Sequence, residues 1–173
     1  GDPANDVVLL GDLDGDGDTD AILTRWRESK ADSRFVYAEN QGRGNFRLRT
    51  DLPAGAGDFL QGRALANFSS ASKLQLALSW HIAGKGIELM TIPPAPMKDE
   101  WKIQKISDFS QDEALSSGDI DGDGRLDLLL GTVWLRNSPD GWRRFTIDPG
   151  RTNPDRNRLA DINHDGKLDA VVG

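Results

Sequence analysis

The chain has 173 residues, of which 37% are hydrophobic and 7% aromatic, which is enough for one domain with a core. It contains no cysteine, which excludes disulfides and a cysteine nucleophile, and its net charge of −7 argues against a nucleic-acid-binding surface. No apolar run approaches the ~18 residues of a membrane-spanning helix. The 19 glycines and 8 prolines, with no long 3.6-residue periodicity, indicate an all-β fold.

Short apolar or alternating runs predict strands along the whole chain, each bounded by Gly, Pro, Asn or Asp. They fall into three sets of four and a final pair, in chain order 6–10, 20–23, 35–40 and 46–52; 63–68, 74–80, 86–92 and 101–106; 114–120, 127–131, 132–137 and 142–147; 158–162 and 169–173. The links Asn40–Asn45 and Asn137–Gly141 contain residues that tolerate positive φ, which is typical of hairpins.

One pattern recurs between the first two strands of every set. It reads GDLDGDGDTDAIL, ANFSSASKLQLAL, GDIDGDGRLDLLL and ADINHDGKLDAVV, and its second residues are spaced 55, 52 and 42 residues apart. Such periods suit one four-stranded propeller blade per repeat. We therefore predict a single domain over residues 1–173, a β-propeller region with blades at about 7–52, 63–106, 114–147 and 157–173, the last one incomplete. Since closed propellers usually have 4–8 blades, we expect the rest of a longer protein or another chain to complete the ring.

Three of the four repeats contain a loop of the form D-x-[DN]-x-D-G-x-x-D. Alternate side chains of such a loop turn inward, and glycine at position 6 permits the sharp turn. Ca²⁺ takes 6–8 hard oxygen ligands, whereas Mg²⁺ rarely accepts a cage made only of protein. The predicted ligands occupy positions 1, 3, 5, 7 and 9, with position 7 contributing its backbone carbonyl: Asp12, Asp14, Asp16, Asp18 and Asp20; Asp119, Asp121, Asp123, Arg125 and Asp127; Asp161, Asn163, Asp165, Lys167 and Asp169. Three bound Ca²⁺ would change the formal net charge from −7 to −1.

The four loops are not equivalent. Asn163 keeps an oxygen donor but lacks a charge, so we expect the last loop to bind calcium more weakly. The second repeat has no carboxylate at its ligand positions and is not expected to bind calcium, although its apolar frame should still fold; those positions hold Asn67, Ser69, Ala71, Lys73 and Gln75. No Glu stands at position 12, and an apolar strand-like run follows each loop, which excludes a helical EF-hand.

Aromatic residues recur at equivalent places in the repeats. Trp101 and Trp142 open predicted fourth strands, whereas Tyr37 and Trp134 lie in predicted third strands. We favour packing between blades over sugar stacking as their role.

The loop strings and the segment VYAENQGRGNF resemble the FG-GAP and VCBS repeats of integrin-α-like β-propellers, and the resemblance covers nearly the whole chain at the level of the blade. The resemblance implies calcium between the first and second strands, at one face of the propeller. It also implies a protein or glycan partner at the other face, and a secreted, cell-surface or periplasmic location. The connections expected at that other face are residues 25–34, 53–62, 80–86, 107–113 and 148–156.

An enzymatic alternative stays open beside the binding module. Some calcium-loop propellers are carbohydrate lyases or dehydratases, and such chemistry needs a base and a charge-stabilising group. The one catalytic candidate is His81, with Trp80 placed to stack on a sugar and with Arg25, Trp26 and Tyr37 as potential neighbours. No G-x-S-x-G, P-loop or HExxH motif is present, and we favour the binding module.

Overall fold

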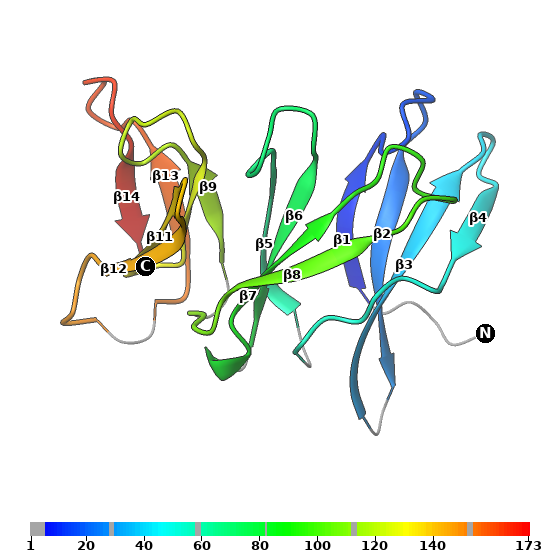
Figure 1. Ribbon diagram of the computed structural model, residues 1–173, viewed down its shortest axis with the longest axis horizontal. Coiled ribbons are helices and arrows are strands. Elements are labelled where there is room, and N and C mark those ends of the chain that lie inside the picture. The colour runs from blue at the N-terminus through cyan, green and yellow to red at the C-terminus, as the bar shows by residue number, and fades with distance from the viewer. Residues whose placement is uncertain (1–5, 28–29, 58–59, 82, 112–113, 152–153) are drawn as a thin grey trace.

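The computed structural model describes residues 6–27, 30–57, 60–81, 83–111, 114–151 and 154–173. Three four-stranded antiparallel sheets and one two-stranded sheet follow one another along the chain (Figure 1). The predicted all-β class, with three four-stranded blades and half of a fourth, is confirmed. In the described residues, no helix has the length and apolar character needed to cross a membrane.

The strands of each sheet pair in sequence order, so every sheet is a simple meander. The first sheet contains β1 (Asp6–Gly11), β2 (Asp20–Arg27), β3 (Lys30–Asn40) and β4 (Phe46–Arg49). The second contains β5 (Leu60–Ala66), β6 (Gln75–Trp80), β7 (Ile87–Thr91) and β8 (Lys102–Ser107), with a 3₁₀ helix at Ala83–Lys85. The third contains β9 (Ser116–Gly118), β10 (Asp127–Leu129), β11 (Val133–Ser138) and β12 (Gly141–Thr146). The last two strands, β13 (Asn157–Ala160) and β14 (Asp169–Val172), pair with each other.

The β2–β3 hairpin differs most from the sequence prediction, which placed a connection at residues 25–34. Instead, β2 and β3 stay paired as far as Arg27 and Lys30, with an irregularity between Arg25 and Arg27. Figure 1 shows this hairpin projecting from the end of the sheet opposite the β1–β2 loop. Residues 25–34 are mostly polar and show no alternation of apolar and polar residues, so hydrophobic periodicity did not predict that the two strands extend into this segment. For the same reason β5 begins at Leu60, three residues before its predicted start.

Side chains of the first and second sheets share one core. Phe35 of β3 lies 6.2 Å from Trp80 of β6 between ring centroids, and both side chains are fully buried. Tyr37 lies 5.7 Å from Trp101, which is also buried. Aromatic pairs at these distances add to the area that they bury. The predicted role of Tyr37 and Trp101 in packing between blades is therefore confirmed.

A second core joins the second and third sheets. Leu89 of β7 belongs to the same buried cluster as Leu128 and Leu135, and Phe68 lies 6.0 Å from the ring of Trp142. The first strands of the second, third and fourth sheets are also neighbours, because β9 contacts both β5 and β13. In Figure 1, the β1–β2, β5–β6, β9–β10 and β13–β14 loops all lie at the same side of the row of sheets, its upper edge.

Trp80 should be the most sensitive position of the first core. Its indole Nε1 donates a hydrogen bond of 2.8 Å to Glu88, and a Cβ on Gly57 would lie 2.2 Å from its ring, so the segment before β5 closes tightly over it. Trp80→Ala is expected to lower the free energy of unfolding by about 3–5 kcal/mol. Urea denaturation measures the change. Phe46→Ala, at a side chain that is 52% exposed, serves as the control and should change stability by about 0.5 kcal/mol or less; equal losses in the two variants would contradict this packing.

Candidate metal centre

The aspartate at position 1 organises each acidic loop by accepting hydrogen bonds from backbone amides. Asp12 accepts one at 2.8 Å from Gly15 and one at 3.1 Å from Gly17. The bond from the position-6 amide to the position-1 carboxylate recurs at 2.9 Å in the third and fourth loops, between Gly124 and Asp119 and between Gly166 and Asp161. Because these bonds wrap the backbone around one carboxylate, three separate segments take up the same loop shape.

Two backbone positions of the loop need a left-handed conformation. Position 6 has φ values of 93°, 83° and 84°, and it is glycine in every acidic loop, as the sequence analysis expected. Position 4 is also left-handed, which was not predicted from the loop pattern. Glycine occupies it in the first and third loops, but in the fourth loop His164 takes φ 61°, a conformation that costs an L-residue about 1 kcal/mol or more.

The aspartate at position 9 ties the loop to the sheet. Asp20 is fully buried and accepts hydrogen bonds from the amide of Leu13 at 3.2 Å, the amide of Asn40 at 2.8 Å and the hydroxyl of Tyr37 at 2.7 Å. Its carboxylate therefore joins the loop to the third strand of the blade. The burial of the phenol and its bond to Asp20 raise the pKa of Tyr37 well above its ordinary value of 10.

The same link occurs in the third and fourth repeats. Asp127 accepts from the amide of Ile120 at 3.2 Å and from that of Asn137 at 2.7 Å, and Asp169 accepts from Ile162 at 3.0 Å. In the third blade, Trp134 replaces the tyrosine. Its buried Nε1 is not aligned for a full hydrogen bond like the one that Tyr37 donates to Asp20, but it lies near enough to Asp127 to favour the charged carboxylate and to offset part of the rise in its pKa.

An asparagine that was not predicted from the sequence completes the junction in two blades. Asn40 donates through Nδ2 to the carbonyl of Thr19 at 3.1 Å. Its equivalent, Asn137, donates to the carbonyl of Leu126 at 3.2 Å and also to that of Phe68 in the neighbouring blade at 2.8 Å. The signal was present in the sequence, because both predicted third strands end in asparagine, in AEN and LRN.

The second repeat builds its loop without acids. Gln75, at position 9, accepts a bond of 3.0 Å from the amide of Ser69 and donates one of 3.1 Å to Thr91. Asn67 donates to the carbonyl of Ala71 at 2.9 Å. Neutral amides thus replace the carboxylates, and the four-stranded second sheet forms around them, as the apolar frame predicted.

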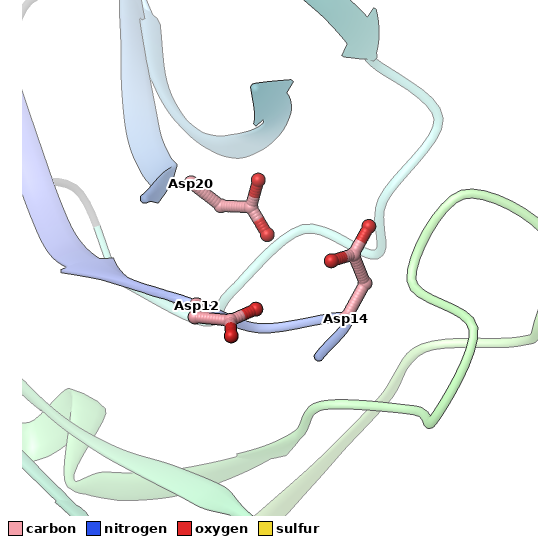
Figure 2. Close-up of side chains that lie close together, drawn as sticks. All are labelled: Asp12, Asp14 and Asp20. Atoms are coloured by element: carbon pink, nitrogen blue, oxygen red, sulfur yellow. The ribbon is translucent and has the colours of Figure 1, made fainter. Parts of the chain in front are cut away.

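Carboxylates converge in two of the loops. The side chains of Asp12, Asp14 and Asp20 point toward one another, as Figure 2 shows, and their ligand oxygens lie within 4.8 Å of one another. The corresponding residues of the third blade form the second such cluster: Asp119, Asp121 and Asp127. Each cluster therefore brings positions 1, 3 and 9 to one point, and each is an arrangement that could hold a metal ion.

Convergence raises the cost of ionising these groups. Loss of hydration raises the pKa of Asp14, and the charges of Asp20, Asp16 and Glu39 raise it further. Burial likewise raises the pKa of Asp127. A bound cation would remove this penalty, because it favours the charged form of each carboxylate.

The other predicted ligands lie around these clusters. The position-5 carboxylates accept the position-7 amide at 2.9 Å in all three loops, but none of them belongs to a convergent group; these are Asp16, Asp123 and Asp165. The position-7 residues are exposed; they are Asp18, Arg125 and Lys167. In the fourth loop, three acidic groups do not converge within the described part of the chain, and Asn163 donates instead to Asp165 at 3.2 Å.

One position of the third strand carries a negative charge beside the first cluster and a positive charge beside the third. Strand pairing makes Glu39 of β3 equivalent to Arg136 of β11. Arg136 forms ion pairs with Asp121 and, at 3.3 Å, with Asp123. Its Nε approaches Asp121 closely but is poorly aligned for a hydrogen bond, so the contact is mainly coulombic. The third cluster is partly neutralised by the protein, whereas the first has an additional negative charge beside it.

Two of the residues expected around His81, Trp80 and Tyr37, are engaged elsewhere. His81 itself is exposed. Trp80 is buried and bonded to Glu88, so the prediction that it stacks on a sugar is wrong. Tyr37 is buried against Asp20 rather than beside His81. The side chains of the other two expected neighbours, at positions 25 and 26, lie outside the described residues.

Comparison with known proteins does not identify a family: no family model matches the chain, and a search of curated proteins found no match. What the structure shows is a repeat of four-stranded antiparallel sheets with two acidic clusters that could hold metal, which is consistent with a propeller-blade repeat.

Tyr37 provides a test of the position-9 junction, because it is the one tyrosine of the chain. Its folded-state pKa is raised above the unfolded value of about 10, so the phenol stabilises the fold below that pH and its contribution is lost as pH rises further. We expect tyrosinate absorbance to appear only in the alkaline range where circular dichroism reports unfolding. Ionisation near pH 10 with the sheet signal intact would show that the phenol is not held by Asp20.

Proposed function

We propose that this chain is a calcium-stabilised propeller region of the FG-GAP/VCBS type that acts as an extracellular binding module for a protein or glycan. One observation carries the proposal: carboxylates at positions 1, 3 and 9 converge in two separate blades, in the same strand register. Acidic turns that bind no ligand would not be expected to place three carboxylates in the same geometry at two points more than a hundred residues apart in the chain. A common ligand for both loops would explain the repeated geometry.

Calcium fits this donor set better than other common ions. The donors are carboxylate and backbone oxygens, which are hard ligands, and no cysteine is available for a softer metal. In the bound loop, the carboxylates at positions 1, 3, 5 and 9 and the carbonyl at position 7 would hold the ion. Modules of this kind bind calcium with dissociation constants of about 10⁻⁴–10⁻³ M, which matches an extracellular calcium supply.

The three loops should bind calcium with different affinities. The first loop has four ligand carboxylates and Glu39 nearby, the third has four with Arg136 against them, and the fourth has three with Asn163. Affinity rises with the negative charge of the ligands. We therefore expect the first loop to bind calcium most tightly.

Calorimetric titration with calcium tests the proposal directly. Three sites per chain are expected, with little heat from magnesium at the same concentration. Asp16→Ala and Asp123→Ala should each remove or weaken one site by about tenfold or more, because each removes a ligand carboxylate. Lys73→Ala, in the acid-free loop, is the matched control and should keep all three sites. No calcium binding by the folded parent protein would refute the proposal.

Arg136 offers a separate prediction about the third loop. Its ion pairs with Asp121 and Asp123 compete with a cation for the same carboxylates. Arg136→Gln is expected to strengthen calcium binding at that loop by about fivefold, or about 1 kcal/mol, which is typical of a partly exposed ion pair. Arg143→Gln is the control, since Arg143 lies on the adjacent strand and pairs with Asp140, away from the loop. Unchanged or weaker binding in Arg136→Gln would mean that the arginine does not compete with the ion.

The partner is proposed to bind away from the acidic loops, at the opposite ends of the strands. The projecting β2–β3 hairpin and the connection after β6 belong to that face (Figure 1). The lyase or dehydratase alternative has no specific observation in its favour, because Trp80 and Tyr37 are engaged elsewhere. Substitution of His81 by alanine, assayed on glycan substrates, would still detect such an activity.

A further inference from the structure

A cleft lies where the first strands of three consecutive sheets meet. It has two adjoining parts of about 370 and 270 Å³, which share Arg63 of β5, Leu115 and Arg158 of β13. Volumes of this order suit a small ligand such as one or two sugar rings. The wall is fixed by hydrogen bonds between neighbouring sheets, at 2.8 Å from Asn157 Nδ2 to the carbonyl of Ala114 and at 3.2 Å from Ser116 to the carbonyl of Asn157.

The cleft is basic in an acidic chain. Arg63, Arg156 and Arg158 line it, and no Asp or Glu does, although the chain has a net charge of −7. Among the described residues, neither Arg63 nor Arg158 has an ion pair with a carboxylate, whereas Arg156 pairs with the exposed Asp155 at 3.2 Å. Arg63 and Arg158 therefore bring two positive charges to the cleft without a protein counter-ion, and an anionic ligand would supply one.

The cleft also offers a hydrogen-bond acceptor that no described group uses. Gln61 lines the smaller part, and its Oε1 is shielded from solvent and has no donor within the described residues. A buried acceptor without a donor costs about 1–3 kcal/mol, so a rotation of the Gln61 side chain that brings Oε1 to a ligand hydroxyl in the cleft would be favourable. The hydroxyl-bearing Ser117 and the apolar Leu159 line the larger part.

We propose that this cleft binds an anionic saccharide, a sugar ring that carries a carboxylate or a sulfate ester. The guanidinium groups of Arg63 and Arg158 hold the anionic group, since arginine forms paired, charge-assisted hydrogen bonds with such groups. A ring hydroxyl donates to Gln61, and the apolar side chains of Leu115 and Leu159 pack against the ring. This inference rests on the proposed function, because it assigns a ligand class and a place to the binding module.

The test is a titration of the calcium-loaded chain, followed by NMR, with three probes that share one ring: glucuronic acid, glucose 6-sulfate and glucose. Binding of either charged sugar at least about tenfold tighter than glucose is expected, and the tighter of the two identifies the anionic group. Arg63→Gln and Arg158→Gln should each weaken that binding about tenfold. Arg143→Gln, at an exposed arginine of β12, is the control and should not change it. Equal binding of glucose would overturn the inference.

Inorganic sulfate and a further variant separate a sugar site from an adventitious ion only. Gln61→Leu should weaken the charged sugars severalfold and leave inorganic sulfate unchanged, since sulfate donates no hydrogen bond. Sulfate binding as tightly as the sugars would show an adventitious ion only and overturn the inference. The calcium titration of Arg63→Gln should match that of the parent, so loss of saccharide binding with intact calcium binding refutes the inference alone. Absence of calcium binding refutes the proposed function instead.

Discussion

The hydrogen-bonded side chain at position 9 of each loop is the constraint on which the rest of this structure depends. It accepts an amide of the loop before it in all four repeats, and in the first and third blades it also accepts an amide of the third strand. One side chain thereby joins three parts of a blade. The four residues are Asp20, Gln75, Asp127 and Asp169. Because Gln75 replaces the aspartate in the second repeat and still accepts the loop amide, the junction needs a hydrogen-bond acceptor but not a charge. The negative charge of the three aspartates therefore has a different role.

That purpose follows from where the carboxylates gather. Buried charge is costly unless it is paired, and the pKa values of Asp14 and Asp127 are raised accordingly. The blades differ in how they avoid or offset the unfavourable burial of charge. The second blade has neutral side chains in place of the acids, and in the third blade Arg136 forms ion pairs with Asp121 and Asp123. The first blade has no such cation against its cluster among the described residues, and it is the place where a divalent ion would contribute most.

The sequence predicted the fold class well because its signals were local. Apolar runs marked the strands, and the repeated loop frame grouped them into blades, including the acid-free one. It did not predict what depends on three-dimensional contacts. Trp80 looked like a surface residue beside His81, yet two sheets close over it. The register that sets Glu39 and Arg136 at the same place becomes visible only once the strands are paired. The basic cleft also arises from three strands far apart in the chain.

The most direct measurement of the account is the thermal unfolding of the chain in excess calcium, in a chelator and in magnesium. An ion that binds only the folded state adds about 1.4 kcal/mol per site at ten times its dissociation constant, and 1 kcal/mol shifts the midpoint by about 2–4 °C in a chain of this size. We expect calcium to raise the midpoint by about 10 °C over the chelator, and magnesium to raise it much less. Equal midpoints in calcium and chelator would contradict it, because the convergent aspartates would then have no ion to bring them together.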